Sequence, residues 1–166
     1  MATVTLGGNP VHTNGELPLV GSTASDFNLV ANDLKEIHLS DFSGSRLILN
    51  IFPSIDTGTC AASVRQFNKL AANLPNTKVL CISRDLPFAQ KRFCGAEGIE
   101  NVVTLSDFNT GDFGKNYGLE LSDSALKGLH SRAIVVLDET HKILHTELVA
   151  EIANEPNYDA AIAVLS

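Results

Sequence analysis

Two short, largely apolar runs separated by one amphipathic stretch constrain the fold of this chain most strongly. The runs are residues 47–52 (LILNIF) and 77–83 (TKVLCIS), and runs of this kind are typical of strands buried on both faces of a sheet. From Cys60 onward, apolar side chains recur at intervals of three and four residues, which predicts a helix that ends near Pro75. Strand, helix and strand in this order predict a right-handed βαβ unit.

Patterned segments on either side extend this unit into a larger sheet. They are alternating stretches over 3–13 and 27–42, a short helix over 86–98, a strand over 101–107, a loop or helical turn over 112–118, a strand–turn–strand over 133–149, and a closing helix from Pro156. In the 86–98 segment Pro87 stands early, and Gly95 is expected after the helix end. Strands that alternate with helices predict an α/β fold whose sheet is covered on both sides.

No linker and no internal repeat divides the chain, and its 166 residues are close to the common size of one domain. We therefore expect a single domain over residues 1–166, in which residues 1–16 form an N-terminal β-hairpin extension. The net charge of −7 argues against a nucleic-acid partner, because phosphate binding requires a basic surface. Neither a signal peptide nor a membrane-spanning run is recognisable, so a cytoplasmic location and no membrane partner are expected.

The three cysteines differ in their surroundings. Cys60 follows a polar, threonine-containing loop at the carboxyl end of the first buried strand, where ligands of α/β sheets usually bind. The N–H groups of a helix start favour a thiolate, and Thr57 or Thr59 is available as a helix cap or as a hydrogen-bond donor. Cys81 lies between Leu80 and Ile82 and is interpreted as a core residue, which is also the commonest role of a buried cysteine.

Cys94 stands near the end of the short helix, and packing beside Phe93 and a redox role both remain open for it. The cysteines fit neither a disulfide framework nor a C-x-x-C metal site, and structural disulfides are rare in a reducing compartment. A cationic partner for a thiolate could be Arg65, Arg84 or Arg132, and the pattern does not choose among them.

His141 and His145 are four residues apart, which would suit a metal on a helix. They fall in a predicted strand hairpin without a third ligand nearby, so we expect no metal site and no bound cofactor. A Cys–His hydrolase dyad has no distinctive support.

The segment NIFPSIDTGTCAASVRQFN (50–68) resembles the active-site loop and helix of peroxiredoxins, through Pro53, Thr57 and Cys60. The match is closest to bacterial thiol peroxidases of the atypical two-cysteine type. ISRDLPFAQKRFCGAEGIENV (82–102) is similar to the resolving-cysteine segment of that family, and later blocks such as LKGLHSRAIVVLDE (126–139) also match. The resemblance covers nearly the whole chain and implies a thioredoxin-like fold with a central mixed sheet flanked by helices.

The resemblance also implies roles for five residues. Cys60 would be the peroxidatic cysteine, Cys94 the resolving cysteine, Thr57 the hydroxyl near the thiolate, Pro53 the shield of the pocket, and Arg132 the supporting arginine. Arg65 and Arg84 would then be surface or packing residues. The family usually has proline where this chain has Gly58, which leaves the four signature positions Pro53, Thr57, Cys60 and Arg132 intact but adds backbone freedom to the loop.

The implied activity is reduction of hydrogen peroxide and organic (alkyl or lipid) hydroperoxides, through a Cys60 sulfenic acid and a Cys60–Cys94 disulfide that thioredoxin reduces. Because Cys60 and Cys94 belong to different helices, local unwinding is expected when they join. A homodimer is also implied. The alternative is a peroxide-sensing relay that passes its disulfide to a partner protein, and a third reading is a structural thioredoxin-like module without redox activity.

Overall fold

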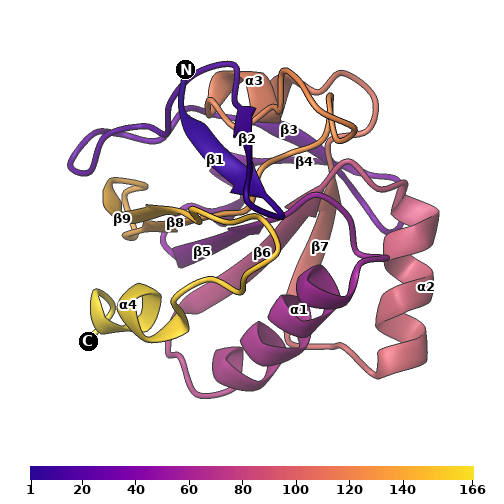
Figure 1. Cartoon of the computed structure of the whole chain (residues 1–166). Helices are drawn as coiled ribbons and strands as arrows, with labels where there is room; N and C mark the ends of the chain where they lie inside the picture. Colours follow the sequence, from indigo (N-terminus) through magenta and orange to yellow (C-terminus); the bar gives the residue numbers. More distant parts are fainter.

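A seven-stranded mixed sheet forms the centre of the computed structural model, which describes all residues from 1 to 166 (Figure 1). The strands are β1 (Thr3–Leu6), β2 (Asn9–His12), β3 (Asn28–Ala31), β4 (Glu36–His38), β5 (Arg46–Ile51), β6 (Thr77–Ser83), β7 (Val102–Ser106), β8 (Ala133–Leu137) and β9 (Ile143–Leu148). The helices are α1 (Gly58–Ala71), α2 (Pro87–Glu97), α3 (Asp112–Asn116), α4 (Tyr158–Ala163) and a 3-10 turn at Leu39–Phe42. This arrangement confirms the predicted α/β fold with a central mixed sheet and an N-terminal hairpin.

The order of strands in the sheet is β4-β3-β7-β6-β5-β8-β9. β5, β6 and β7 are parallel, as the predicted βαβ unit requires, whereas β8 runs antiparallel to β5 and pairs Ala133 with Ile51. Arg132 directly precedes β8, so this register places it beside the carboxyl end of β5. The loop that leads to Cys60 leaves the sheet at the same end.

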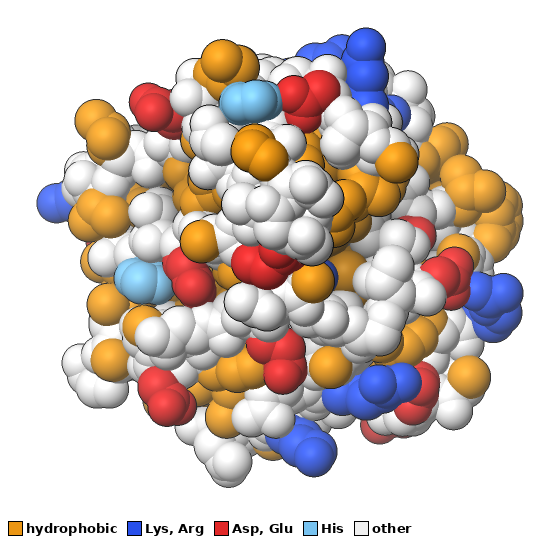
Figure 2. Space-filling view, viewed as in Figure 1, with side chains coloured by type: hydrophobic (Ala, Val, Ile, Leu, Met, Phe, Trp, Pro, Cys, Tyr) orange, Lys and Arg blue, Asp and Glu red, His pale blue; other side chains and the backbone are white.

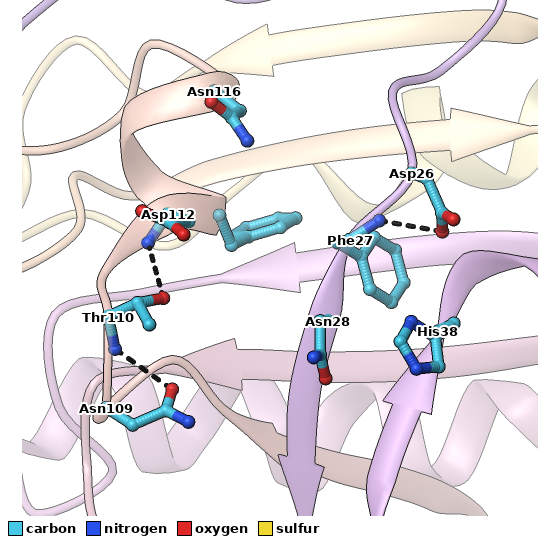
Figure 3. Close-up of a pocket in the computed structure, with 9 residues that line it drawn as sticks. Asp26, Phe27, Asn28, His38, Asn109, Thr110, Asp112 and Asn116 are labelled. Carbon is cyan, nitrogen blue, oxygen red and sulfur yellow. Dashed lines mark hydrogen bonds between the residues drawn. The ribbon is translucent and has the colours of Figure 1, made fainter.

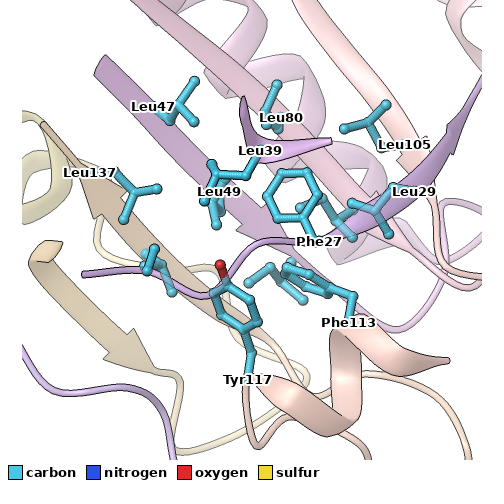
Figure 4. Packing of buried hydrophobic residues seen from close by; sticks show 14 of the residues in the cluster. Phe27, Leu29, Leu39, Leu47, Leu49, Leu80, Leu105, Phe113, Tyr117 and Leu137 are labelled. Atoms are coloured by element: carbon cyan, nitrogen blue, oxygen red, sulfur yellow. The ribbon is translucent and has the colours of Figure 1, made fainter. Parts of the chain in front are cut away.

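The alternation of side chains along the central strands divides the core into two layers. On one face, Leu47, Leu49 and Ile51 of β5 pack with residues of α3 and of the segment before β3 (Figure 4). There Tyr117 stacks on Phe113 at 4.4 Å between ring centroids. On the other face, Ile48 of β5 and Phe52, which follows the strand, pack with residues of α1, α2 and α4. All three cysteines belong to or contact this second layer.

The ends of two helices differ from the prediction. α1 begins at Gly58, so Cys60 is its third residue rather than its first, and it ends at Ala71, before the expected stop near Pro75. α2 continues through Gly95 and ends at Glu97, where Gly98 adopts the left-handed conformation with φ of 65°. The prediction that Gly95 follows the helix end was wrong, because Gly98 is the glycine that supplies the C-terminal cap.

The N-terminal hairpin of β1 and β2 forms its own small sheet and contacts the segment that follows β9. Thr5 bridges to Glu151, and Val4 and Val11 pack with Leu121 and Ile152 in a small third cluster. The hairpin and this segment lie side by side in Figure 1. Through Ile152, the hairpin therefore reaches the neighbourhood of Arg132.

Acidic and basic side chains are interspersed on the face of the molecule drawn in Figure 2. None of the helices combines the length and the apolar character that crossing a membrane would demand.

Candidate active site

Cys60 and Arg132 meet at the carboxyl end of β5, although they are 72 positions apart in the sequence. The Nη2 group of Arg132 donates a hydrogen bond to Cys60 Sγ at 3.3 Å. Cys60 is fully buried and Arg132 is only 2% exposed, so this contact is shielded from bulk water. A charged donor in such a place interacts strongly with negative charge on the sulfur, because water screens the attraction little.

A second hydrogen bond, to a backbone carbonyl, holds Arg132 in place. Its Nε donates to the carbonyl of Ile152 at 2.8 Å, and its buried Nη1 has no hydrogen-bond partner. A buried guanidinium nitrogen without a partner is unusual, since buried donors are nearly always satisfied. Nη1 is therefore available to an oxygen atom that approaches Cys60.

A cavity of about 280 Å³ lies over this pair. Its lining includes Pro53, Thr57 and Arg132, together with four apolar side chains from three segments, Leu6, Leu126, Leu129 and Ile152. Cys60 is not part of the lining but lies beneath it, with its sulfur against Arg132. The structure thus brings together four of the five predicted site residues, Pro53, Thr57, Cys60 and Arg132.

The loop before α1 is shaped by its own hydrogen bonds. The carbonyl of Ser54 accepts from both the backbone N–H and the Oγ1 of Thr57, at 3.2 and 3.0 Å. Thr57 occupies the position before the first residue of α1, but its side chain caps no helical N–H. Side-chain capping by Thr57 or Thr59 is therefore wrong, but the alternative role of hydrogen-bond donor is confirmed, since Thr57 Oγ1 donates to Ser54 and Thr59 Oγ1 to the carbonyl of Ala153.

Cys94 is the fifth predicted site residue, and the structure places it apart from the other four. It is half-buried on α2, and its Sγ lies 3.8 Å from Thr104 Oγ1 on β7. Burial raises the pKa of the Cys94 thiol above its ordinary value. All three cysteines are free, and the sulfurs of Cys60 and Cys94 have different partners. A bond between these two would require one or both helices to move.

Cys81 is fully buried on β6, which confirms its interpretation as a core residue. Burial raises its pKa to about 12, so this thiol stays protonated at neutral pH. The other two arginines have structural contacts. Arg65 pairs with Glu97 on the surface, and Arg84 donates to the carbonyls of Asp107, Phe108 and Gly128.

His141 and His145 do not form a metal site. His141 lies in the β8–β9 turn with φ of 65° and contacts the carbonyl of Phe42, while His145 lies on β9. The structure contains no group of three or more His, Cys, Asp or Glu side chains that could hold a metal ion.

A second hollow of about 300 Å³ lies between α3 and the edge strands β3 and β4 (Figure 3). Its polar lining includes Asp26, His38 and Asp112, and none of the predicted site residues. This second hollow holds neither a cysteine nor a buried charged side chain. The cavity above Cys60 is therefore the better candidate for an active site.

Comparison with known proteins agrees with this geometry. The family model described as Redoxin matches residues 19–162. The chain belongs to the Redoxin family. It is 55% identical to the thiol peroxidase of Corynebacterium glutamicum over the full length of both chains. The resemblance to bacterial thiol peroxidases is thereby confirmed, and with it a peroxiredoxin-type oxidoreductase.

Solved structures show the same fold. The peroxiredoxin-like protein from Aquifex aeolicus superposes with a TM-score of 0.94 at 37% identity, covering 99% of this redoxin chain and 96% of its own. The thiol peroxidase from Chromobacterium violaceum superposes with a TM-score of 0.91 at 24% identity, covering 98% and 94% of the two chains. These structures confirm the expected thioredoxin-like fold.

Three residues that support the site were missed by the sequence analysis. Glu151 accepts hydrogen bonds from Gly8 N–H, Ala153 N–H and Thr5 Oγ1, and so fixes the turn whose Ile152 carbonyl holds Arg132. The other two are Ser54 and Asp85, which hold the loop before α1. Such polar loop residues carry no periodic signal, because their partners are backbone groups distant in sequence.

We expect Glu151→Gln to loosen the hairpin in a pH-dependent way. The hydrogen bonds, that of the Ala153 N–H above all, lower the pKa of Glu151 to about 2. A carboxyl with a lowered pKa stabilises the fold fully above its ordinary pKa, and this contribution is lost as the pH falls toward the lowered value. The Tm of wild type should therefore exceed that of Glu151→Gln by a constant margin above about pH 5, and the margin should shrink toward pH 2. A margin independent of pH, or one also seen for the exposed control Glu16→Gln, would contradict this.

Cys94 gives a second pH-dependent prediction. Because burial raises the pKa of the Cys94 thiol, the folded protein keeps the thiol proton at a pH at which an exposed cysteine would lose it. The protonated thiol therefore contributes fully to the stability of the folded protein below the ordinary pKa of cysteine. This contribution is lost as the pH rises through the higher pKa of Cys94 in the folded protein. In the Cys60→Ser variant, alkylation of Cys94 by iodoacetamide, mapped by peptide mass spectrometry, should reach half its maximal rate at a higher pH than in the urea-unfolded chain. An equal or lower midpoint would show that Cys94 is not protected.

Proposed function

We propose that this redoxin is a thiol peroxidase that reduces hydrogen peroxide and organic hydroperoxides to water and alcohols. The observation that carries the proposal is the hydrogen bond from Arg132 to Cys60 Sγ beneath a cavity. A peroxide in the cavity would meet a sulfur nucleophile, a charged donor and an unpaired N–H at one point. The apolar side chains of Leu126, Leu129 and Ile152 would accommodate the hydrocarbon part of an organic hydroperoxide.

In the first step, the Cys60 thiolate attacks one peroxide oxygen. A sulfur–oxygen bond forms, the O–O bond breaks, and two electrons pass from sulfur to the peroxide. The second oxygen leaves as hydroxide or alkoxide and takes a proton to become water or an alcohol. Arg132, the Thr57 hydroxyl and the N–H groups at the start of α1 would stabilise the charge that develops on the moving oxygens.

In the second step, the Cys94 thiolate attacks the sulfenic sulfur of Cys60. The disulfide forms, and hydroxide leaves and is protonated to water. We propose that a thioredoxin-type dithiol then reduces this disulfide by exchange, supplying two electrons and two protons. Such a donor works in a reducing compartment, so we place the cycle in the cytoplasm.

We further propose that the protein functions as a homodimer. Leu86 and Phe88 at the start of α2 are 52% and 65% exposed, and Phe108 is 37% exposed. Leu86 and Phe108 line a hollow with Leu129, which also lines the cavity over Cys60. An apolar surface of this kind next to a site is suited to contact with a second copy. Sedimentation velocity on the reduced protein would test this, and a monomer at micromolar concentration would contradict it.

The cycle is tested by peroxide-dependent oxidation of NADPH in the presence of thioredoxin and thioredoxin reductase. Hydrogen peroxide and cumene hydroperoxide are supplied in separate reactions, and intact and peptide mass spectrometry locate the disulfide. Sustained turnover with a Cys60–Cys94 bond is the expected result. A persistent mixed disulfide with a protein partner, without turnover, would instead indicate a redox relay, and absence of both would overturn the proposed function.

A further inference from the structure

Asp85 connects the loop that precedes Cys60 to the segment from which the Cys94 helix begins. It lies between β6 and α2, two residues before Pro87, the first residue of α2. Its Oδ1 accepts from Ser54 Oγ at 2.8 Å, and its Oδ2 accepts from Ile55 N–H at 2.7 Å and from Ser83 Oγ at 2.6 Å. No Lys, Arg or His forms an ion pair with it, so hydrogen bonds alone satisfy this half-buried carboxylate.

The loop contacts of Asp85 bear directly on the start of α1. Ser54, which donates to Asp85, is the residue whose carbonyl accepts both the N–H and the Oγ1 of Thr57. Thr57 in turn immediately precedes α1, and Cys60 is the third residue of that helix. One carboxylate therefore fixes Ser54 and Ile55, and through them the conformation in which the first turn of α1 presents Cys60 to Arg132.

On its other side, Asp85 is fixed to the sheet and to α2. The carbonyl of Asp85 accepts from Ser106 Oγ at the end of β7. Ser83 Oγ, which donates to the carboxylate, also accepts from Nε2 of Gln90, a fully buried residue of α2. Asp85 is therefore bonded to the ends of β6 and β7, and through Ser83 to α2, as well as to the loop before α1.

We propose that Asp85 is a positioning residue that holds the Cys60 loop in its peroxide-reactive conformation and that releases this loop when Cys60 and Cys94 join. The inference rests on the two-cysteine cycle proposed above. In that cycle Cys60 Sγ leaves Arg132 and Cys94 Sγ leaves Thr104, and we expect the start of α1 to unwind so that the two sulfurs can meet. The bonds from Ser54 and Ile55 to Asp85 are among those that oppose this movement.

The Asp85→Asn variant tests the effect of Asp85 on oxidation of Cys60 and on disulfide formation separately. It keeps the shape of the side chain and replaces one acceptor oxygen by a donor. The two steps are followed by rapid mixing with hydrogen peroxide, an alkylating quench and intact mass spectrometry, which distinguishes a gained oxygen from two lost hydrogens. Oxidation of Cys60, measured in the Cys94→Ser background, should slow by about 10-fold, because hydrogen bonds to a charged group are lost. Disulfide formation, measured with Cys94 present, should be unchanged or faster.

The matched control is Arg92→Gln. Arg92 on α2 pairs with Asp56 of the same loop at 3.1 Å, but both side chains are exposed, so this bridge should contribute little. Both rates of Arg92→Gln should lie within about 2-fold of wild type. If Asp85→Asn does not fold, as judged by circular dichroism, Ser54→Ala removes one of the three hydrogen bonds and should shift the two rates in the same opposed directions, by a smaller factor.

Opposed changes of the two rates are the readout that a purely structural role would not give. If Asp85→Asn slows both steps by the same factor, or changes neither, the proposed role of Asp85 is wrong while the two-cysteine cycle stands. If the wild-type chain forms no Cys60–Cys94 disulfide in the same experiment, both proposals are overturned.

Discussion

Replacement of Cys60 by serine should lower peroxide-dependent turnover by about 10³-fold or more, because a hydroxyl at this position cannot replace a thiolate nucleophile. The serine oxygen would still lie beneath the cavity and could still accept from Arg132, so binding geometry would be largely kept. The coupled NADPH assay measures the loss, and the thermal unfolding curve shows that the fold is retained.

Cys81→Ser is the matched control for this variant. Its side chain would be buried next to Asn50, whose Oδ1 has no partner and could accept from the new hydroxyl. Turnover of Cys81→Ser should stay within about 2-fold of wild type, since the residue lies in the core and not in the cavity. Turnover that survives Cys60→Ser but not Cys81→Ser would show that the reactive cysteine has been misassigned.

Replacement of Arg132 by methionine should slow the oxidation of Cys60 by about 10²- to 10³-fold, the usual cost of removing a donor that stabilises developing charge. Methionine has a similar reach but offers neither the 3.3 Å bond to Cys60 Sγ nor the unpaired Nη1. The rate is measured by competition with horseradish peroxidase for a limiting amount of hydrogen peroxide, which reports the first step alone.

Arg132→Lys tests whether geometry matters beyond charge. A single ammonium group cannot donate to the Ile152 carbonyl and to Cys60 Sγ from two nitrogens in a fixed plane, as the guanidinium does. Only a minor part of the lost rate should therefore return in Arg132→Lys. Full recovery would mean that a positive charge alone is sufficient and that the forked contact is unimportant.

Much of this fold could be predicted from the sequence because its central strands are buried on both faces. The apolar runs of β5 and β6 and the helical spacing of α1 are local signals, and the structure confirms them. The helix ends were less predictable. Gly95 and Gly98 are equally compatible with a C-terminal cap, and only the packing of α2 decides that Gly98 adopts a positive φ.

Only part of the candidate site could be predicted from local sequence patterns. Cys60 could be placed from the strand and helix that flank it, whereas the residues alone left three arginines equivalent. Arg132 is set apart by the antiparallel pairing of β8 with β5, a long-range contact that no local pattern encodes. The resemblance to thiol peroxidases supplied what the pattern could not. Glu151 and Asp85 remained hidden because they bind backbone groups of distant loops.

The pairing of Ile51 with Ala133 has a consequence for repeated turnover. Arg132 adjoins a strand inside a seven-stranded sheet, whereas Cys60 lies in the first turn of a helix whose start is expected to unwind in the proposed two-cysteine cycle. In that cycle we expect the guanidinium to keep its position while the sulfur moves toward Cys94 and returns. Arg132, held by the Ile152 carbonyl, would then offer the Cys60 thiolate the same hydrogen-bond donor in the same position after each reduction.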